Sequence, residues 1–551
     1  MIERWLCSSL HRVFPSTPAS DASRLELLAA RNSRVSFQAC VRNTTVKPEE
    51  VSLEVSSDLE VSIRRVGYVP VKHHNTDTDE SELDGVGKIP GFVPDPLFNE
   101  SSVTAGPFET HAFWVTIHVP ENASPGKREL AIRCQTGPTG QTSQTGPTET
   151  LSAEIDVRPL VIRPADDFPV AHWFYADALC DWYKVEPFDE GFWRIVKPYM
   201  QDVVSHGGNC MYVPLFTPPT DGVKRPTQLV RVTALAHRSD ESDMSDLSDT
   251  REYQFDFSDV KRWVDLAREC GAKWFEWTHF FWQWGVQYAL RIYRSNHADG
   301  SALLWPPETP ATSETYRNFL GQFLPKFHEF LVAEGLLDRS IFHVSDEPHG
   351  DEHLENYRKA RAMLRELAPW MKVADAVSDI RFGQEGLTDM PIPSISVAKS
   401  FVEAGIPSYA YFCCGPRGKY LQRLMDTPLA KIAMSGWLFH KLRAQGFLHW
   451  GYNYWHKSQT QELIDPFTEQ SGCAWPGWAY GDTFVVYPGE AGPIDSIRWE
   501  VFAESLQDLA LLRTAGIDQD DPLLAEIRDY NDFPRTEEWI VLARRRILTN
   551  E

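Results

Sequence analysis

Several features that mark common classes of protein are missing from this sequence of 551 residues. No window reaches about 18 consecutive apolar residues, so no segment has the length of a membrane-spanning helix. The N-terminus, MIERWLCSSLHRVF, lacks the apolar run of a signal peptide, which favours a cytoplasmic location. The sequence of a secreted protein from which the signal peptide had been trimmed would show the same N-terminal pattern.

Positive charge is also scarce. The chain has 54 Lys and Arg against 77 Asp and Glu, a formal net charge of −23. Because such a surface repels phosphate backbones and anionic lipids, we expect neither nucleic acid nor a membrane surface as a partner. No glycine-rich phosphate loop is present, and none of the nine cysteines forms a CxxC pair. We therefore predict reduced thiols and no cofactor.

Aromatic residues, in contrast, are plentiful. The chain contains 19 Trp, within an aromatic fraction of 12%. Indole rings fill large cores, and they also stack on the apolar C–H faces of pyranose rings. Composition alone does not separate a core role from a sugar-binding role.

The chain divides into three regions by pattern. Short alternating runs separated by turns fill residues 1–165 and predict a β-sandwich. The alternating runs are Arg34–Val41, Val51–Val55, Val61–Val71, Ala112–Val119, Glu129–Cys134 and Leu151–Val161. Residues 166–460 form the second region, and 461–551 are predicted to be a small C-terminal extension packed on it. That extension contains a helix capped near Ser496.

In the second region, strand-like runs alternate with helical stretches, which is typical of a (β/α)8 barrel. The expected strands are 172–177, 210–216, 273–280, 340–346, 372–378, 394–398, 408–413 and 447–455. The fold class is therefore α/β: a TIM-like barrel preceded by a β-sandwich. Catalytic groups in such barrels lie at the carboxyl ends of the strands.

One Asp-Glu pair lies at such a strand end. The chain has five of these pairs, and four are typical of solvated loops or helix N-termini. Asp346–Glu347 differs because it directly follows the apolar run 341–344. Neighbouring strand residues point to opposite faces, so we expect the two carboxylates to have different surroundings. A structural ion pair is the alternative role for this pair.

Four segments, one of which contains this pair, carry a family resemblance. HVSDEP at 343–348, GFLHWGYNYW at 446–455 and WPGWAYGDTFVVYPG at 475–489, followed by SIRWEVFAESLQDLALL, resemble glycoside hydrolase family 123 and the related domain of unknown function 4091. The similarity runs over roughly residues 110 to 515. Only the Asp-Glu strand and the C-terminal motifs are specific to the family.

The resemblance implies a β-N-acetylgalactosaminidase that retains anomeric configuration by substrate assistance. Glu347 would be the general acid/base, and Asp346 would orient the acetamido group and stabilise the oxazolinium ion. Physical reasoning agrees, because adjacent acids cannot easily straddle a glycosidic bond as a two-carboxylate mechanism requires. Adjacency thus favours a 2-acetamido sugar, although a third acid such as Asp177 or Asp375 could restore an ordinary pair.

Residues at other strand ends are candidates for binding the sugar. Tyr409 and Tyr411 alternate on the seventh strand, and one could hydrogen-bond the acetamido carbonyl. Asn453 and Trp455 suit a hydroxyl contact and a stacking floor on the eighth strand. The third strand offers two more candidates, Trp277 and His279. A core position is the alternative for each of the six.

Other functions stay open at this point. His343, His349 and His353 near the acidic pair raise the possibility of a metal-dependent hydrolase, but no HExxH or paired Cys/His spacing occurs, and we predict no metal. The substrate could instead be a β-N-acetylglucosaminide or a plain hexoside. A non-catalytic carbohydrate-binding protein is the alternative from another class. The sequence does not indicate an oligomeric state.

Overall fold

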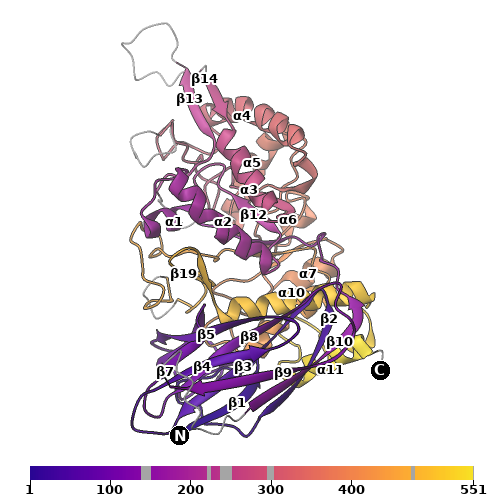
Figure 1. The fold of residues 1–551 in the computed structure, drawn as a ribbon. Coiled ribbons are helices and arrows are strands. Elements are labelled where there is room, and N and C mark those ends of the chain that lie inside the picture. The colour runs from indigo at the N-terminus through magenta and orange to yellow at the C-terminus, as the bar shows by residue number, and fades with distance from the viewer. Residues whose placement is uncertain (138–149, 220–224, 236–250, 295–302, 473–477, 550–551) are drawn as a thin grey trace.

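The protein consists of a β-sandwich beside a parallel barrel, with a long C-terminal helix between them (Figure 1). The computed structural model describes residues 1–137, 150–219, 225–235, 251–294, 303–472 and 478–549. Within these ranges, no helix combines the length and the apolar character needed to cross a membrane. The predicted order of sandwich and TIM-like barrel is confirmed.

The β-sandwich has two five-stranded sheets. One has the order β1 (Ile2–Ser8), β3 (Ser33–Asn43), β8 (Thr110–Val119), β5 (Glu60–Val71) and β6 (Gly91–Phe98). The other has the order β2 (Arg24–Arg31), β10 (Thr150–Val161), β9 (Gly126–Thr136), β4 (Glu49–Ser56) and β7 (Ser102–Ala105). Alternate residues such as Phe37, Ala39 and Val41 of β3 point between the sheets and form the core there.

The barrel contains eight parallel segments in chain order. Six form one hydrogen-bonded sheet: β11 (Val170–His172), β12 (Cys210–Val213), β15 (Trp274–Trp277), β16 (Ser340–Ile341), β17 (Ala410–Tyr411) and β18 (Phe447–His449). Isolated parallel bridges continue it from Phe342 to Val373, from Ala376 to Ile392 and from Ser394 to Tyr411. Since β18 also pairs with β11, the ring closes.

Helices connect successive strands of the barrel. They are α1 (Ala176–Tyr183), α2 (Glu190–Ser205), α3 (Ser258–Glu269), α4 (Glu314–Ala333), α5 (Gly350–Leu367), α6 (Arg381–Gln384), α7 (Ala398–Glu403), α8 (Leu429–Ala433) and α9 (Ser435–Lys441). Two antiparallel strand pairs form separate two-stranded sheets: β13 (Arg231–Leu235) with β14 (Glu252–Asp256), and β19 (Val486–Pro488) with β20 (Pro493–Asp495).

Several barrel strands are shorter than the sequence predicts. The run 172–177 contains only the last residue of β11, and α1 begins at Ala176. The eighth strand ends at His449, although the apolar pattern continues to 455. Residues beyond the strand ends remain buried because loops cover them, so hydrophobicity alone overestimates strand length. The sequence pattern also missed β1, β2, β6 and β7 in the sandwich.

Helix α10 (Ile497–Ala515) joins the two parts. Its first turn is capped as predicted, because the Ser496 hydroxyl accepts a hydrogen bond from Trp499 N. One side of α10 packs against α8 and α9, and another contacts β3 and β6 of the sandwich (Figure 1). The helix is therefore buried along most of its length. The last helix, α11 (Glu537–Thr549), contacts β2 and β10.

Candidate active site

A cavity at the carboxyl ends of the barrel strands contains the Asp-Glu pair. Its lining is aromatic and acidic, with two adjacent thiols: Trp173, Trp284, Asp346, Glu347, Ala376, Tyr411, Cys413, Cys414, Leu448, Trp450 and Trp478. Most of these residues lie at or just after a strand end, while Trp284 and Trp478 come from loops. Tryptophan faces beside carboxylates suit the apolar faces and the reacting oxygens of a sugar.

Both acids face this cavity because the chain turns between them. Glu347 has a backbone φ of 43°, in the left-handed region that side chains rarely adopt. Regular strand geometry has ended there, so both side chains line one cavity, with Asp346 buried and Glu347 half-buried. Asp346 O accepts a hydrogen bond from Trp284 N at 2.9 Å, which ties the turn to a pocket loop. The strained turn therefore places two neighbouring carboxylates on one wall.

Tyr411 contacts the second acid directly. Its hydroxyl donates a hydrogen bond to Glu347 Oε1 at 2.6 Å. Burial and the nearby Glu347 charge raise the pKa of Tyr411 well above its ordinary value, so the phenol keeps its proton. The seventh strand thus fixes the position of the Glu347 side chain.

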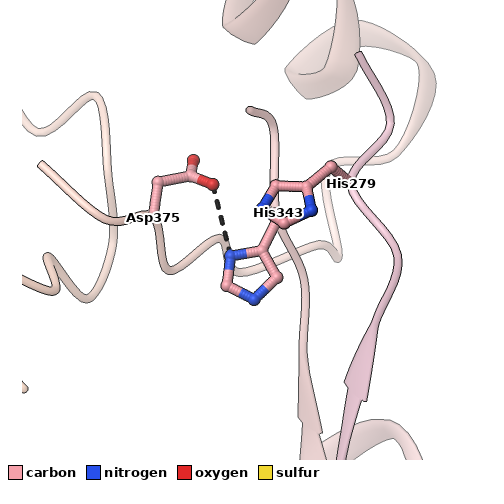
Figure 2. A group of neighbouring side chains, drawn as sticks. All are labelled: His279, His343 and Asp375. Atoms are coloured by element: carbon pink, nitrogen blue, oxygen red, sulfur yellow. Dashed lines mark ion pairs between the residues drawn. The ribbon is translucent and has the colours of Figure 1, made fainter. Parts of the chain in front are cut away.

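A buried group of charges lies beneath the two acids. His343, three residues before Asp346, has Nε2 2.7 Å from Glu276 Oε1 and Nδ1 3.3 Å from Asp375 Oδ1. Burial alone lowers the pKa of His343, but the two carboxylates raise it to about 10. Figure 2 shows the ion pair with Asp375 and the ring of His279 next to His343. Because Glu276 also accepts a hydrogen bond from Trp173 Nε1 at 2.8 Å, the group supports a wall of the cavity.

His279, His343 and Asp375 each offer a ligand atom within 4.8 Å of the others, as a metal site requires. Their hydrogen bonds favour a structural role over metal binding. Asp375 accepts hydrogen bonds from Val344 N and the Tyr357 hydroxyl, and protonated His343 has no lone pair for a metal. Within the described ranges, neither group with metal-site spacing includes His349 or His353.

Among the six predicted sugar contacts, the structure brings only Tyr411 into the cavity lining. Tyr409 lies deeper in the barrel, against Gly446. The Asn453 side chain bonds both backbone groups of Tyr175 and is fully buried. Tyr409 and Asn453 therefore occupy core positions, which was the alternative to a sugar contact for each of them.

The other three predicted contacts are also enclosed by protein. Trp455 donates to Val486 O at 3.1 Å, and Trp277 donates to Ser340 Oγ at 2.8 Å while packing on Phe327 of α4. His279 stacks on His343 below the cavity, with ring centroids 4.5 Å apart. None of the three lines the cavity as the described residues define it.

Four tryptophans that the sequence did not single out as sugar contacts line the cavity instead. Trp173 and Trp450 directly follow β11 and β18, so correct strand ends would have identified them. Trp450 Nε1 donates to Asp482 Oδ2 at 2.9 Å, and its ring meets Trp478 edge-on. Trp284, at 42% exposure, stands at the rim. Loop tryptophans such as Trp284 and Trp478 carry no positional signal in the sequence.

The two acids considered as distant partners do not line the cavity. Asp375 is fully buried in the group below it. Asp177 lies in α1, with Oδ2 3.9 Å from His456 Nδ1. In the part of the chain that the structure describes, the cavity lining contains only the two neighbouring carboxylates.

A larger cavity of about 660 Å³ lies elsewhere, between the sandwich and the barrel. Asn209, Gly271 and Lys273 line it, and they precede β12 and β15. It therefore lies at the amino ends of the strands, where barrel enzymes do not place their chemistry.

A barrel with a carboxylate pair and tryptophan walls at its strand ends is typical of enzymes that hydrolyse glycosides. The model of the glycoside hydrolase 123 catalytic domain matches residues 173–515. The chain belongs to glycoside hydrolase family 123. The resemblance noted from the sequence motifs is thereby confirmed.

A solved structure of the same family shares the fold. A family 123 glycoside hydrolase from Clostridium perfringens, studied for glycolipid glycan hydrolysis, has a TM-score of 0.73 and 14% identity, covering 100% of this chain and 98% of that chain. A FixG-related protein from Vibrio parahaemolyticus has a TM-score of 0.14 and 10% identity, covering 23% of this chain and 80% of its own. A TM-score that low establishes no shared fold. Among curated proteins, no sequence matches this chain.

Proposed function

We propose that this enzyme releases terminal β-linked N-acetylgalactosamine with retention, using the substrate's own acetamido group as nucleophile. The observation that carries the proposal is the cavity lining, in which the described carboxylates are the neighbours Asp346 and Glu347. Neighbours on one wall cannot attack from one side of the anomeric carbon and protonate on the other. An internal nucleophile removes that requirement.

In the first step, the acetamido carbonyl oxygen bonds to the anomeric carbon while the glycosidic bond breaks. Glu347 gives its proton to the departing oxygen. Asp346 accepts a hydrogen bond from the acetamido N–H and stabilises the positive charge of the oxazolinium ion. In the second step, Glu347 removes a proton from water, which attacks the same carbon and restores the acetamide.

The surrounding residues prepare this chemistry. Tyr411 holds Glu347 through the 2.6 Å hydrogen bond. Trp173 and Trp450 have their indole N–H groups bonded to Glu276 and Asp482, so their ring positions are fixed before the sugar binds. Because the Clostridium perfringens relative was studied for glycolipid glycan hydrolysis, we further propose the glycan of a glycolipid as the natural substrate.

Substrate preference tests this proposal. Chromogenic β-N-acetylgalactosaminide, β-N-acetylglucosaminide and β-galactoside should be compared, and a thiazoline mimic of the oxazoline should be added as an inhibitor. We expect hydrolysis of the first compound, no hydrolysis of the β-galactoside, and inhibition by the thiazoline. Faster hydrolysis of the glucosaminide would change the sugar assignment, and full activity on the galactoside would exclude substrate assistance.

Two further measurements distinguish a metal-dependent hydrolase and a binding protein from the proposed enzyme. Loss of activity with EDTA, restored by a divalent metal, would identify a metal-dependent hydrolase. Glycan binding without turnover would identify a binding protein. Release of N-acetylgalactosamine from a glycolipid, measured beside the chromogenic compound, tests the natural substrate.

A further inference from the structure

The cavity wall contains two neighbouring thiols that the proposed reaction does not use. Cys413 and Cys414 follow β17, and both line the cavity together with Glu347 and Tyr411. Their sulfur atoms are 3.9 Å apart, and both residues are half-buried rather than enclosed. The described cysteines are all free thiols.

We propose that Cys413 and Cys414 form a dithiol site that binds a trivalent arsenical across both sulfurs and thereby blocks the cavity. A tetrahedral soft ion with metal–sulfur bonds of about 2.3 Å holds its two sulfurs roughly 3.8 Å apart. Pyramidal trivalent arsenic has narrower S–As–S angles and holds them somewhat closer, so from 3.9 Å one arsenic bridges both sulfurs after a small rotation of the side chains. A disulfide, with an S–S bond of about 2.05 Å, would need a large local rearrangement.

The neighbouring groups supply the nucleophile. The hydrogen bond between the two sulfurs lowers the pKa of Cys414 against the effect of burial, and the charge of Arg417 acts in the same direction. Arg417 is tied to this loop because its Nε donates to Cys414 O at 2.6 Å. Cys414 is thus the first sulfur to attack, and Cys413 then closes the ring.

The reaction is balanced without an oxidant. In water, phenylarsine oxide is the dihydroxy compound of trivalent arsenic. Each thiol forms one As–S bond as one As–O bond breaks, and each departing hydroxide leaves with a thiol proton as water. Two water molecules are released, and arsenic stays trivalent throughout.

A bound arsenical would occupy the space that the sugar needs. The cavity has a volume of about 110 Å³, and the dithiol forms part of the same wall as Tyr411 and Glu347. A phenyl group on arsenic would therefore exclude a pyranose ring from the acids. This consequence for turnover rests on the proposed function, whereas the binding itself does not.

The chain offers a matched control pair. Cys7 and Cys40 lie on β1 and β3 of the sandwich with their sulfurs 3.6 Å apart. Burial and the bond to Cys7 raise the pKa of Cys40 well above its ordinary value. Cys40 is buried, whereas Cys413 and Cys414 are both half-buried and line the cavity, so the sandwich pair should react poorly with a reagent that must reach both sulfurs.

The test treats the reduced enzyme with one equivalent of phenylarsine oxide and locates the adduct by peptide mass mapping. We expect one adduct on the peptide that contains Cys413 and Cys414, removed by 2,3-dimercaptopropanol but not by excess 2-mercaptoethanol. Each enzyme's turnover should then be compared before and after treatment. Wild type and Cys7→Ser should lose at least about tenfold, and Cys413→Ser/Cys414→Ser should lose none.

Each outcome bears on one claim. An adduct on another peptide, or one removed by the monothiol, would overturn the dithiol site. The same loss of turnover in the double variant would also overturn it. Because the mapping uses wild type, the result does not depend on whether the variants fold. If the untreated enzyme cleaves no glycoside, the proposed function fails, while the mapping still decides the dithiol site.

Discussion

At the scale of single residues, Glu347 has a backbone conformation that costs energy. A left-handed φ of 43° in a non-glycine residue costs about 1–2 kcal/mol. Glu347 lies beyond the end of β16, and the proposed reaction requires its carboxylate on the same wall as that of Asp346. Strain at such a position is typical of functional sites.

Glycine at this position should relieve the strain. We expect Glu347→Gly to be more stable than Glu347→Ala by about 1 kcal/mol, because both lose the carboxylate and only glycine adopts positive φ freely. Urea unfolding of the two variants measures the difference. Equal stability would mean that the turn is not strained, and both variants should lack turnover.

Tyr411 should matter for catalysis, and its neighbour two positions earlier should not. Tyr411→Phe removes a hydrogen bond to a charged group, and a loss of about 1.5 kcal/mol or more would lower kcat/KM roughly tenfold or more. Tyr409→Phe serves as the matched control, since Tyr409 lies against Gly446 away from the cavity. Steady-state kinetics distinguishes them. A larger loss in Tyr409→Phe would support the role predicted from sequence for that residue.

At the scale of elements, the ends of the barrel strands determine which side chains reach the cavity. β18 ends at His449, so Trp450 is the first residue beyond it, and Asp482 from the following segment holds its indole at 2.9 Å. Burial raises the pKa of Asp482 well above its ordinary value. Burial thus favours the neutral form of this carboxyl, which accepts the hydrogen bond from the indole.

The role of Asp482 as hydrogen-bond acceptor for Trp450 predicts which substitutions are tolerated. Asp482→Asn keeps a carbonyl acceptor at the same place and should stay near wild type. Asp482→Ala frees the Trp450 ring, and we expect KM to rise about three- to tenfold with a smaller change in kcat, as weakened ring stacking would give. Equal kinetics for the Ala and Asn variants would contradict this role.

Much of the architecture could be predicted from the sequence, but less of the site. Eight apolar runs separated by helical stretches predicted the barrel, and an acidic pair after one run marked its mouth. The eighth strand, however, was extended to 455, which moved the expected contacts to Asn453 and Trp455 and away from Trp450. Burial by covering loops looks the same as burial in a strand when only the sequence is known.

At the scale of the whole molecule, buried ion pairs join the sandwich to the barrel. Arg64 of β5 reaches Glu500 of α10 at 2.6 Å and also pairs with Asp495. His206, after α2, lies beside the same acids, with Nε2 3.3 Å from Glu500 Oε1. Burial lowers the pKa of His206, but Asp202, Asp495 and Glu500 raise it to about 10. Burial and Asp202 raise the pKa of Asp495 to about 8.

The raised histidine pKa gives the interface a pH dependence. A pKa raised from 6.5 to about 10 gives stability that is complete below pH 6.5 and is lost as pH rises toward 10. We therefore expect the Tm difference between wild type and His206→Gln to be large at pH 6.5 and small at pH 10. His118→Gln is the control, because burial lowers the pKa of His118 and its effect should be constant over this range. A constant difference for His206→Gln would contradict the assignment.

The most direct test of Glu347 as the general acid/base measures kcat/KM of Glu347→Gln on an aryl β-N-acetylgalactosaminide. General acid/base catalysis contributes about 10²- to 10⁴-fold, so we expect a loss of at least about 100-fold. Glu352→Gln is the matched control, since Glu352 belongs to an exposed Asp-Glu pair at the start of α5 and should keep wild-type turnover. Wild-type turnover in Glu347→Gln would contradict this role of Glu347.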